Sequence, residues 1–285
     1  MSACEAIAAP PTTGMQAGTE APATQAEARR ELRCAVVRMV AAAREGHIPS
    51  AFSILDILYV LYQDCLHTNP GAPQDPDRDY FILSKGHAGA ALYAVLAHFG
   101  FFASALLETY CRRGSILGGH PDRLKVPGVE VSAGSLGHGI AMGVGVALGL
   151  RHKGSARKVV VLVGDGEAEE GSFWESITMI KNTGLTNLVV ILDQNRSQRY
   201  AHPFRMQEIL AGFDWSAQTV DGHDVQALSR CLVPLVRTTQ VRPAFVVANT
   251  TKGFPVARFM NDPSWHRRSP NDDELREILQ EIQCR

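Results

Sequence analysis

Two short runs of β-branched residues, separated by one helical segment, constrain the fold of this sequence more than any other feature. Residues 158–163 (KVVVLV) and 188–192 (LVVIL) are typical of strands buried on both faces of a parallel sheet. Between them, Phe173 and Ile177 recur at helical spacing, and Gly184 ends the helix. The order of strand, helix and strand predicts a right-handed βαβ unit.

The same alternation continues along the chain. Residues 79–83 (DYFIL) and 244–248 (AFVVA) are two further candidate strands. Apolar periodicity and Gly or Pro boundaries predict further helices near residues 27–45, 53–66, 88–99, 136–150, 225–236 and 271–282. We therefore expect a doubly wound, mainly parallel α/β sheet flanked by helices. Ser172 and Glu175 have the spacing of a capping box, which predicts that the helix between the two central strands opens at Ser172.

No internal repeat or second compositional block divides the sequence, so we expect a single folded domain over residues 26–285. Residues 1–25 are rich in Ala, Pro and Thr and contain few large apolar groups, which predicts a disordered N-terminal tail. This tail has no basic residue before Arg29 and no continuous apolar core. It therefore matches neither a secretory signal nor a transit peptide.

Composition excludes several classes of partner. The net charge is -1, from 28 basic and 29 acidic residues, so nothing favours binding to nucleic acid or to an anionic membrane. The longest uncharged apolar stretch, residues 140–150, is well short of the roughly 20 residues that a membrane span needs. Six cysteines lack a C-x-x-C pair, which argues against a zinc site and a disulfide scaffold and favours a cytoplasmic location.

Polar residues at the ends of the two central strands predict a ligand site. Asp165 and Asn195 both stand at strand ends, and ligands bind beyond the carboxyl ends of such strands. A carboxylate and an amide oxygen suit Mg²⁺, which takes few protein ligands and completes its octahedron with phosphate oxygens and water. The helix opening at Gly171 and Ser172 adds N–H groups and partial positive charge. An isolated Gly-Asp-Gly is usually a simple turn, but here a buried strand precedes it and a helix follows.

Residues 164–195, GDGEAEEGSFWESITMIKNTGLTNLVVILDQN, resemble a thiamine-diphosphate motif, which begins with Gly-Asp-Gly and closes on an asparagine. Five other stretches are similar to transketolases: EGHIPSAFSILDILYVLY, DRDYFILSKGHAGAALY, GGHPDRLKVPGVEVSAGSLGHGIAMGVG, VDGHD and FMNDPSWHRRSPNDDEL. The resemblance to the transketolase family covers nearly all of the sequence after the tail. It implies the thiamine-diphosphate-binding fold, its diphosphate-binding domain, and thiamine diphosphate with Mg²⁺ as cofactors.

The resemblance also implies roles for individual residues. The implied Mg²⁺ ligands are Asp165, Asn195 and the backbone carbonyl of Ser197. The residues implied to contact thiamine diphosphate are His87, Gly134, Ser135, Leu136, Gly164, Asp165, Gly166, Glu170 and Asn195. Glu170 matches an acidic residue that carries protons between sites at a dimer interface, although a solvated glutamate favoured by the helix dipole is an equal alternative.

Four histidines, His47, His87, His120 and His266, match positions that line the cofactor and substrate channel in the family. Imidazoles suit catalysis there, because ketol transfer moves protons on and off sugar hydroxyls near neutral pH. His223, within VDGHD, also matches a family motif, but we expect this residue to structure its loop. The sequence departs from the family pattern at two places. After the asparagine at position 195 the family usually has Gly, then Leu or Ile, then Gln, whereas this sequence has Arg196, Ser197 and Gln198. His138 stands where many relatives have Gln.

The implied activity is transfer of a two-carbon ketol unit from a ketose to an aldehyde. The sequence ends before a pyrimidine-binding domain, whose glutamate activates the cofactor. We therefore expect a partner chain, a separate C-terminal transketolase subunit, in an α2β2 heterotetramer. One alternative is a decarboxylating acyloin or deoxyxylulose-phosphate-synthase-like carboligase subunit that uses a keto-acid donor. The other is a non-catalytic cofactor-binding scaffold subunit.

Overall fold

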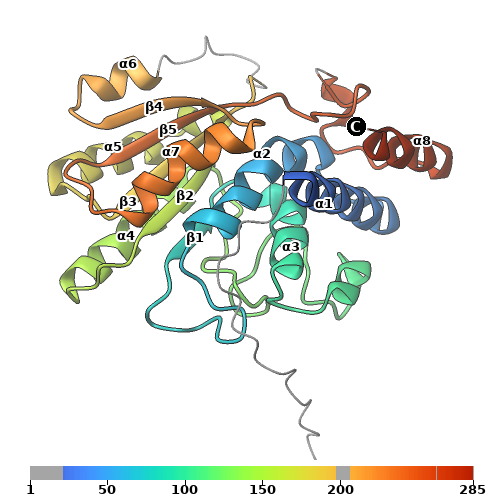
Figure 1. Ribbon diagram of the computed structural model, residues 1–285, viewed down its shortest axis with the longest axis horizontal. Coiled ribbons are helices and arrows are strands. Elements are labelled where there is room, and N and C mark those ends of the chain that lie inside the picture. The colour runs from blue at the N-terminus through green and yellow to red at the C-terminus, as the bar shows by residue number, and fades with distance from the viewer. Residues whose placement is uncertain (1–21, 197–205, 261, 285) are drawn as a thin grey trace, which may run out of the picture.

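The computed structural model describes residues 22–196, 206–260 and 262–284, and these contain one sheet of parallel strands (Figure 1). The strands are β1 (Tyr80–Leu83), β2 (Val159–Gly164), β3 (Leu188–Gln194), β4 (Ser216–Asp221) and β5 (Ala244–Asn249). Their spatial order is β1-β2-β3-β5-β4, and every neighbouring pair is parallel. The predicted doubly wound parallel α/β sheet is therefore confirmed.

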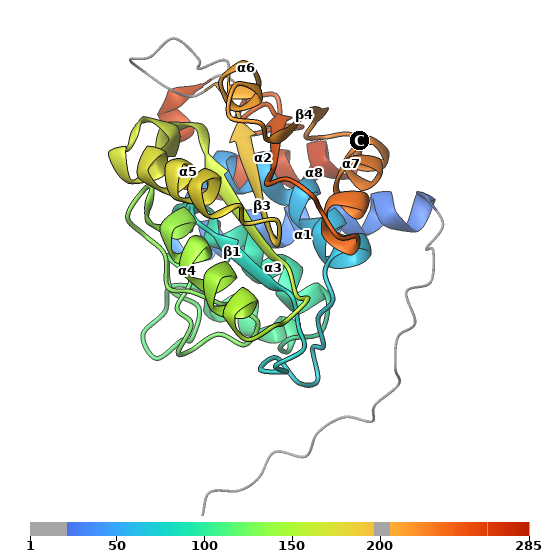
Figure 2. The same cartoon turned by 90° about the vertical axis from the view of Figure 1, so that its left-hand side faces the viewer.

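Helices cover both faces of this sheet (Figures 1 and 2). One face packs against α4 (His138–His152), α5 (Gly171–Thr183) and α6 (Met206–Ala211). The other face is covered by α2 (Ile48–Val60), α3 (Gly89–His98) and α7 (Val225–Arg237). Helix α1 (Pro22–Ala43) extends the same core by packing on α2 and α3, and α8 (Asp272–Gln283) packs on α1. A π-helical turn, Leu61–Cys65, continues α2. Among the described residues, no helix is both long and apolar enough to cross a membrane.

Strand β2 shows why its sequence is continuously apolar rather than alternating. Val159, Val161 and Val163 face the α4 and α5 side, and Val160 and Leu162 face the α2 and α3 side. All five side chains are fully buried. Because successive residues of a strand point to opposite faces, a strand covered by helices on both sides needs apolar residues at every position.

The first two helices, α1 and α2, each begin about five residues earlier than the sequence pattern predicts. Helix α1 starts at Pro22, five residues before Glu27, and Pro is well suited to a first helical turn because the N–H it lacks has no partner there. Helix α2 likewise starts at Ile48 with Pro49 in its first turn. Residues 1–21, which include most of the predicted tail, lie outside the described residues, and the boundary at residue 26 stays a prediction.

The predicted capping box at Ser172 and Glu175 is wrong. Helix α5 starts one residue earlier, at Gly171, with Glu170 as its N-cap residue and no side-chain hydrogen bond at the cap. The hydroxyl of Ser172 instead faces Gly137, where an added Cβ would lie 2.4 Å from Ser172 Oγ. Packing of the α4 and α5 N-termini against each other therefore takes the place of the local cap.

Sequence patterns did not reveal β4 or α6. Strand β4 (SAQTVD) is an edge strand that pairs only with β5, and most of its side chains are partly or fully exposed. An edge strand of this kind needs no run of apolar residues, so its sequence resembles a loop.

Candidate functional site

The carboxyl ends of β2 and β3 bring Asp165 and Asn195 to the same edge of the sheet. Gly164 of β2 is in register with Asp193 of β3, so both side chains stand just beyond a pair of adjacent strand ends. Asp165 is 3% exposed and Asn195 is 9% exposed. The Asp165 carboxylate accepts a hydrogen bond from the Gly166 N–H at 2.9 Å. Ser197, the third predicted Mg²⁺ ligand, lies outside the described residues.

Beneath this edge, Asp193 is the centre of a buried polar network. Its carboxylate accepts hydrogen bonds from Lys85 Nζ at 2.5 Å, Ser53 Oγ at 2.8 Å, Asn195 Nδ2 at 2.8 Å and Thr250 Oγ1 at 2.5 Å. Burial favours a higher pKa for this carboxyl group, but Lys85 and the hydrogen bonds outweigh burial and lower the pKa. Asp193 is therefore ionised and pairs with Lys85.

This network orients Asn195. Since Asn195 Nδ2 donates to Asp193, the amide oxygen is the end of the side chain that can bind a cation. Together with the Asp165 carboxylate it forms a pair of hard oxygen donors. Among the described residues, no three His, Cys, Asp or Glu side chains converge on a metal position. The donor set therefore fits Mg²⁺, which can complete its shell with diphosphate oxygens and water, better than a metal held by protein ligands alone.

A second buried acid, Glu167, joins three loops at this edge. Glu167 Oε1 accepts hydrogen bonds from Ser84 Oγ at 2.5 Å and the Gly137 N–H at 2.9 Å. Glu167 Oε2 accepts from the Gly164 N–H at 2.8 Å. Gly137, which caps α4, has φ +77, a backbone conformation that favours glycine. The Glu167 side chain thus fixes the ends of β1 and β2 relative to the start of α4.

We expect Glu167→Gln to lower the free energy of unfolding by about 1–3 kcal/mol, because its amide NH₂ would face a backbone N–H and leave a buried donor unpaired. Glu169, two residues away, is exposed. The matched change Glu169→Gln should alter stability by less than about 0.5 kcal/mol. Urea unfolding followed by circular dichroism measures both variants, and equal effects would contradict the assigned hydrogen bonds.

The loop before α4 carries the other residues predicted to contact the cofactor. Gly134, Ser135 and Leu136 are exposed, and Leu136 retains 36% exposure, which is unusual for a leucine beside a buried site. The ring of His120 lies against this loop, since a Cβ at Gly134 would be 3.5 Å from His120 Cδ2. Glu170 is exposed at the N-cap of α5, with its Cβ 2.8 Å from the position that a Cβ on Gly137 would take.

Three of the four predicted histidines form one cluster. The ring centroids of His47 are 5.3 Å from His87 and 5.2 Å from His266, and those of His87 and His266 are 6.2 Å apart. His120 lies beside Gly86, where an added Cβ would be 3.1 Å from His120 Cδ2. The four residues come from segments far apart in the sequence, so the fold brings together what the motifs predicted separately.

Two histidines of the cluster, His47 and His87, are neutral because they are buried. Burial lowers the pKa of His47 to about 4, with further contributions from His266, Arg267 and other nearby basic side chains. Burial and the adjacent Lys85 lower the pKa of His87 to about 2. Neutral imidazoles can accept a proton from a hydroxyl group, which charged imidazoles cannot do.

We expect folding stability to fall as the pH drops from about 6.5, because the unfolded histidines gain protons there while His47 and His87 in the folded chain do not. In histidine Cε1–H NMR spectra, the signals of His47 and His87 should not titrate between about pH 8 and pH 5. These signals should vanish in His47→Gln and His87→Gln, respectively. A titration midpoint near 6.5 for either residue would contradict the buried neutral cluster.

Lys252 is a site residue that sequence reasoning missed. Its ammonium nitrogen is 3.0 Å from His266 Nδ1, and burial together with Lys85 lowers the Lys252 pKa to about 8. The available signal was the position of Thr-Lys-Gly (residues 251–253), separated by two residues from the strand predicted at 244–248, because residues that follow a parallel strand stand at its carboxyl end. Lys85 and Asp193 were missed as well, although both lie in motifs that the sequence singled out.

His223 has the loop-structuring geometry predicted for it. Its Nε2 accepts the Thr251 N–H at 2.9 Å, and its Nδ1 lies 3.1 Å from Asp56 Oδ2, so the proton of the neutral ring is on Nδ1. Asp56 is fully buried and also pairs with Arg29 and Arg33. This chain of contacts ties α1 and α2 to the segment that carries Lys252.

A parallel α/β sheet with an oxygen-donor pair, a helix N-terminus and a histidine cluster at its carboxyl edge defines a metal-diphosphate cofactor domain. The family model described as the transketolase, thiamine diphosphate binding domain matches residues 24–283. The chain therefore belongs to the transketolase family and carries its thiamine-diphosphate-binding domain.

Individual proteins are similar to this chain over most of its length. One of the subunits of the apulose-4-phosphate transketolase of Actinobacillus succinogenes is 36% identical over 83% of this chain and 87% of its own length. A protein of Rhodococcoides fascians named ferredoxin fas2 is 41% identical over 73% of this chain and 68% of its own length. The solved transketolase of Leishmania mexicana superimposes with a TM-score of 0.83 at 25% identity, over 91% of this chain. This chain spans only 41% of that longer protein.

Proposed function

We propose that this chain is the diphosphate-binding subunit of a transketolase that moves a two-carbon ketol unit from a ketose to an aldehyde. One observation carries the proposal: the Asp165 and Asn195 oxygen pair stands at the same sheet edge as a cluster of histidines. The first feature suits a metal-bound diphosphate, and the second suits proton transfer to and from sugar hydroxyls. Family membership supports the combination.

The chemistry that thiamine diphosphate supplies when bound is a nucleophilic ring carbon, which accepts the ketol unit. Asp165 and Asn195 would hold the metal ion, with the Ser197 carbonyl as a proposed third ligand. Gly164, Gly166 and the first turn of α5 would lie against the diphosphate. Gly134, Ser135 and Leu136 would line the rest of the cofactor.

The histidines would act on the substrate side. His47 and His87, held neutral by burial, would accept and return protons of donor hydroxyls, and His120 and His266 would orient the sugar. Lys252 would add positive charge beside His266. Glu170, exposed next to the α4 N-terminus, would contact a neighbouring chain of the assembly and pass protons between sites.

We further propose that a separate chain completes the active site. Relatives that this chain matches over 87% and 89% of their length are each named as one subunit of an apulose-4-phosphate transketolase, which implies a second subunit. A partner chain would supply the pyrimidine-binding domain and its activating glutamate, and two such pairs would form an α2β2 heterotetramer in the cytoplasm.

Subunit mixing tests this proposal. The chain is expressed alone and together with the protein encoded beside it, and the molar mass of each purified sample is measured by light scattering. We expect a heterotetramer from coexpression and ketol transfer only in that sample. Full ketol-transfer activity of the single chain would contradict the need for a partner.

A decarboxylating carboligase is a second candidate, because the Lys252 ammonium beside His266 offers a positive charge for the carboxylate of a keto-acid donor. Release of labelled CO₂ from [1-¹⁴C]pyruvate by the assembled enzyme, without transfer from ketoses, would favour this candidate. A scaffold without catalysis would bind the cofactor but turn over neither donor.

A further inference from the structure

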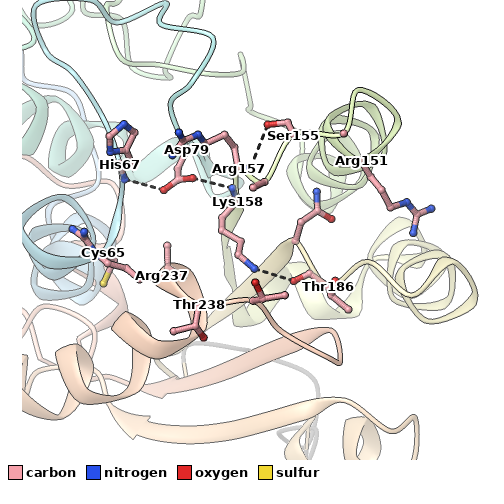
Figure 3. A pocket seen from close by; sticks show the side chains of 15 residues that line it. Cys65, His67, Asp79, Arg151, Ser155, Arg157, Lys158, Thr186, Arg237 and Thr238 are labelled. Carbon is pink, nitrogen blue, oxygen red and sulfur yellow. Dashed lines mark hydrogen bonds between the residues drawn. The ribbon is translucent and has the colours of Figure 1, made fainter.

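A cavity of about 610 Å³ lies at the amino edge of the sheet, opposite the edge that carries Asp165. Asp79, Lys158 and Asn187, which directly precede β1, β2 and β3, line it together with residues 154–157 and the end of α7. Figure 3 shows the side chains that line the cavity, with Asp79 and Lys158 among those labelled. Its size is that of a site for a small organic ligand.

Positive charge dominates the lining. Four cationic side chains, those of Arg151, Arg157, Lys158 and Arg237, line the cavity, and the one carboxylate in the described lining is that of Asp79. Both oxygens of that carboxylate already accept backbone N–H groups, from His67 at 2.8 Å and from Lys158 at 2.9 Å. Arg151 donates to the Thr183 carbonyl at 2.6 Å and Arg237 to the Asp64 carbonyl at 2.9 Å. The chain as a whole has a net charge of -1, so the cavity concentrates a charge opposite to that of the molecule.

Lys158 lies at the centre of this charge. The residue is only 8% exposed, and its ammonium group makes one long hydrogen bond, 3.3 Å to the Thr186 carbonyl (Figure 3). Within the described residues, no carboxylate oxygen lies within 4.0 Å of Lys158 Nζ. Burial lowers the Lys158 pKa, and Asp79 offsets this only in part. An ammonium group has three protons to donate, so Lys158 retains donor capacity toward the cavity.

Helix ends explain part of the charge but not all of it. Arg151 and Arg237 lie in the last turns of α4 and α7, where a cation stabilises the helix dipole. Each helix C-terminus contributes about half a negative charge, so the C-termini of α4, α5 and α7 offset part of the positive charge of the lining. Lys158 lies in no helix and has no carboxylate partner among the described residues. Arg157 also lies in no helix, and its one ion pair in the described part of the chain, with Asp77 at 3.8 Å, is exposed to solvent.

We propose that this cavity binds a small organic phosphomonoester, at a site separate from the thiamine diphosphate site. The phosphate group would accept charge-assisted hydrogen bonds from Lys158 and Arg157 on one side and from Arg237 on the other. The hydroxyl groups of Ser155 and Thr238, which also line the cavity, would contact the organic part. A cavity of about 610 Å³ is much larger than a phosphate ion needs, which favours an organic ester.

The test titrates glycerol 2-phosphate into the full chain by calorimetry, at constant ionic strength and with thiamine diphosphate and Mg²⁺ in excess. This probe has no carbonyl group and cannot serve as a ketol donor or acceptor. We expect binding that weakens about tenfold in Arg157→Gln, which loses a charge-assisted contact, and more in Lys158→Met. Arg276→Gln, which removes an exposed arginine of α8, is the matched control and should bind normally.

Asp165→Asn should bind glycerol 2-phosphate like the unmodified chain, because the cavity is at the other edge of the sheet. Loss of binding in Asp165→Asn, or unchanged binding in Arg157→Gln, would overturn the proposal. If inorganic phosphate binds as tightly as glycerol 2-phosphate, the proposal that the ligand is an organic ester is contradicted. Arg157 is partly exposed, so its variant gives an answer even if Lys158→Met fails to fold. No arm measures turnover, so the outcome is independent of the proposed transketolase activity.

Discussion

Asp165→Ala is expected to weaken thiamine diphosphate binding in the presence of Mg²⁺ by about 100-fold, or about 2.7 kcal/mol. The change removes the only carboxylate of the proposed metal site and leaves the Asn195 amide oxygen as its partner. Without that charge, the metal ion loses its strongest protein ligand and the diphosphate loses its bridge to the protein. Isothermal titration calorimetry of the coexpressed complex measures the effect.

Two further variants locate the cause. Asp165→Asn keeps the size of the side chain and an oxygen that can accept from the Gly166 N–H, so a loss of affinity in this variant reports the charge itself. Asp273→Ala removes a carboxylate that is 80% exposed on α8 and should leave cofactor binding unchanged. Unchanged affinity in Asp165→Ala would show that the metal is held elsewhere.

Lys85→Met is expected to lower the free energy of unfolding by about 3–5 kcal/mol, because it leaves the Asp193 carboxylate buried without its counter-charge. Both partners are almost fully buried, with side-chain exposures of 2% and 0%. Ser53, Thr250 and Asn195 would still donate hydrogen bonds to Asp193, but none of them carries a charge. Urea unfolding gives the difference.

A surface ion pair supplies the matched control. Lys125 pairs with Asp122 at 3.4 Å, and their side chains are 61% and 34% exposed. Lys125→Met should cost no more than about 1 kcal/mol, since solvent screens exposed pairs. The double variant Lys85→Met/Asp193→Asn should regain part of the stability that Lys85→Met loses. Similar losses in Lys85→Met and Lys125→Met would contradict the buried pair.

The central strands and the core were predictable where the sequence pattern reports burial directly. The central strands appear as apolar runs because helices cover both faces, and the register of β2 and β3 makes Asp165 and Asn195 neighbours. Strand β4 escaped prediction because an edge strand can be polar. The proposed capping box failed because Ser172 contacts Gly137, a residue 35 positions earlier in the chain, instead of its own helix.

The remaining site residues depend on contacts that no local pattern encodes. Lys85 and Asp193 are 108 positions apart, and Ser84 and Glu167 are 83 positions apart. The histidine cluster was predicted from family motifs, which record such contacts indirectly. Arg196 replaces the glycine that is usual at this position in the family, and its backbone has φ +58, a conformation that favours glycine.

The most direct test of ketol transfer follows ¹³C label from a ketose labelled at C1 and C2 into an aldehyde acceptor by NMR. The samples are this chain with its partner subunit, each chain alone, and the complex carrying Asp165→Ala. We predict that adjacent labelled carbons appear together in a lengthened acceptor only in the unmodified complex, and only with thiamine diphosphate and Mg²⁺. Label transfer that persists in Asp165→Ala would contradict the proposed activity. So would the absence of transfer from every ketose donor tested, in an unmodified complex that has bound its cofactor.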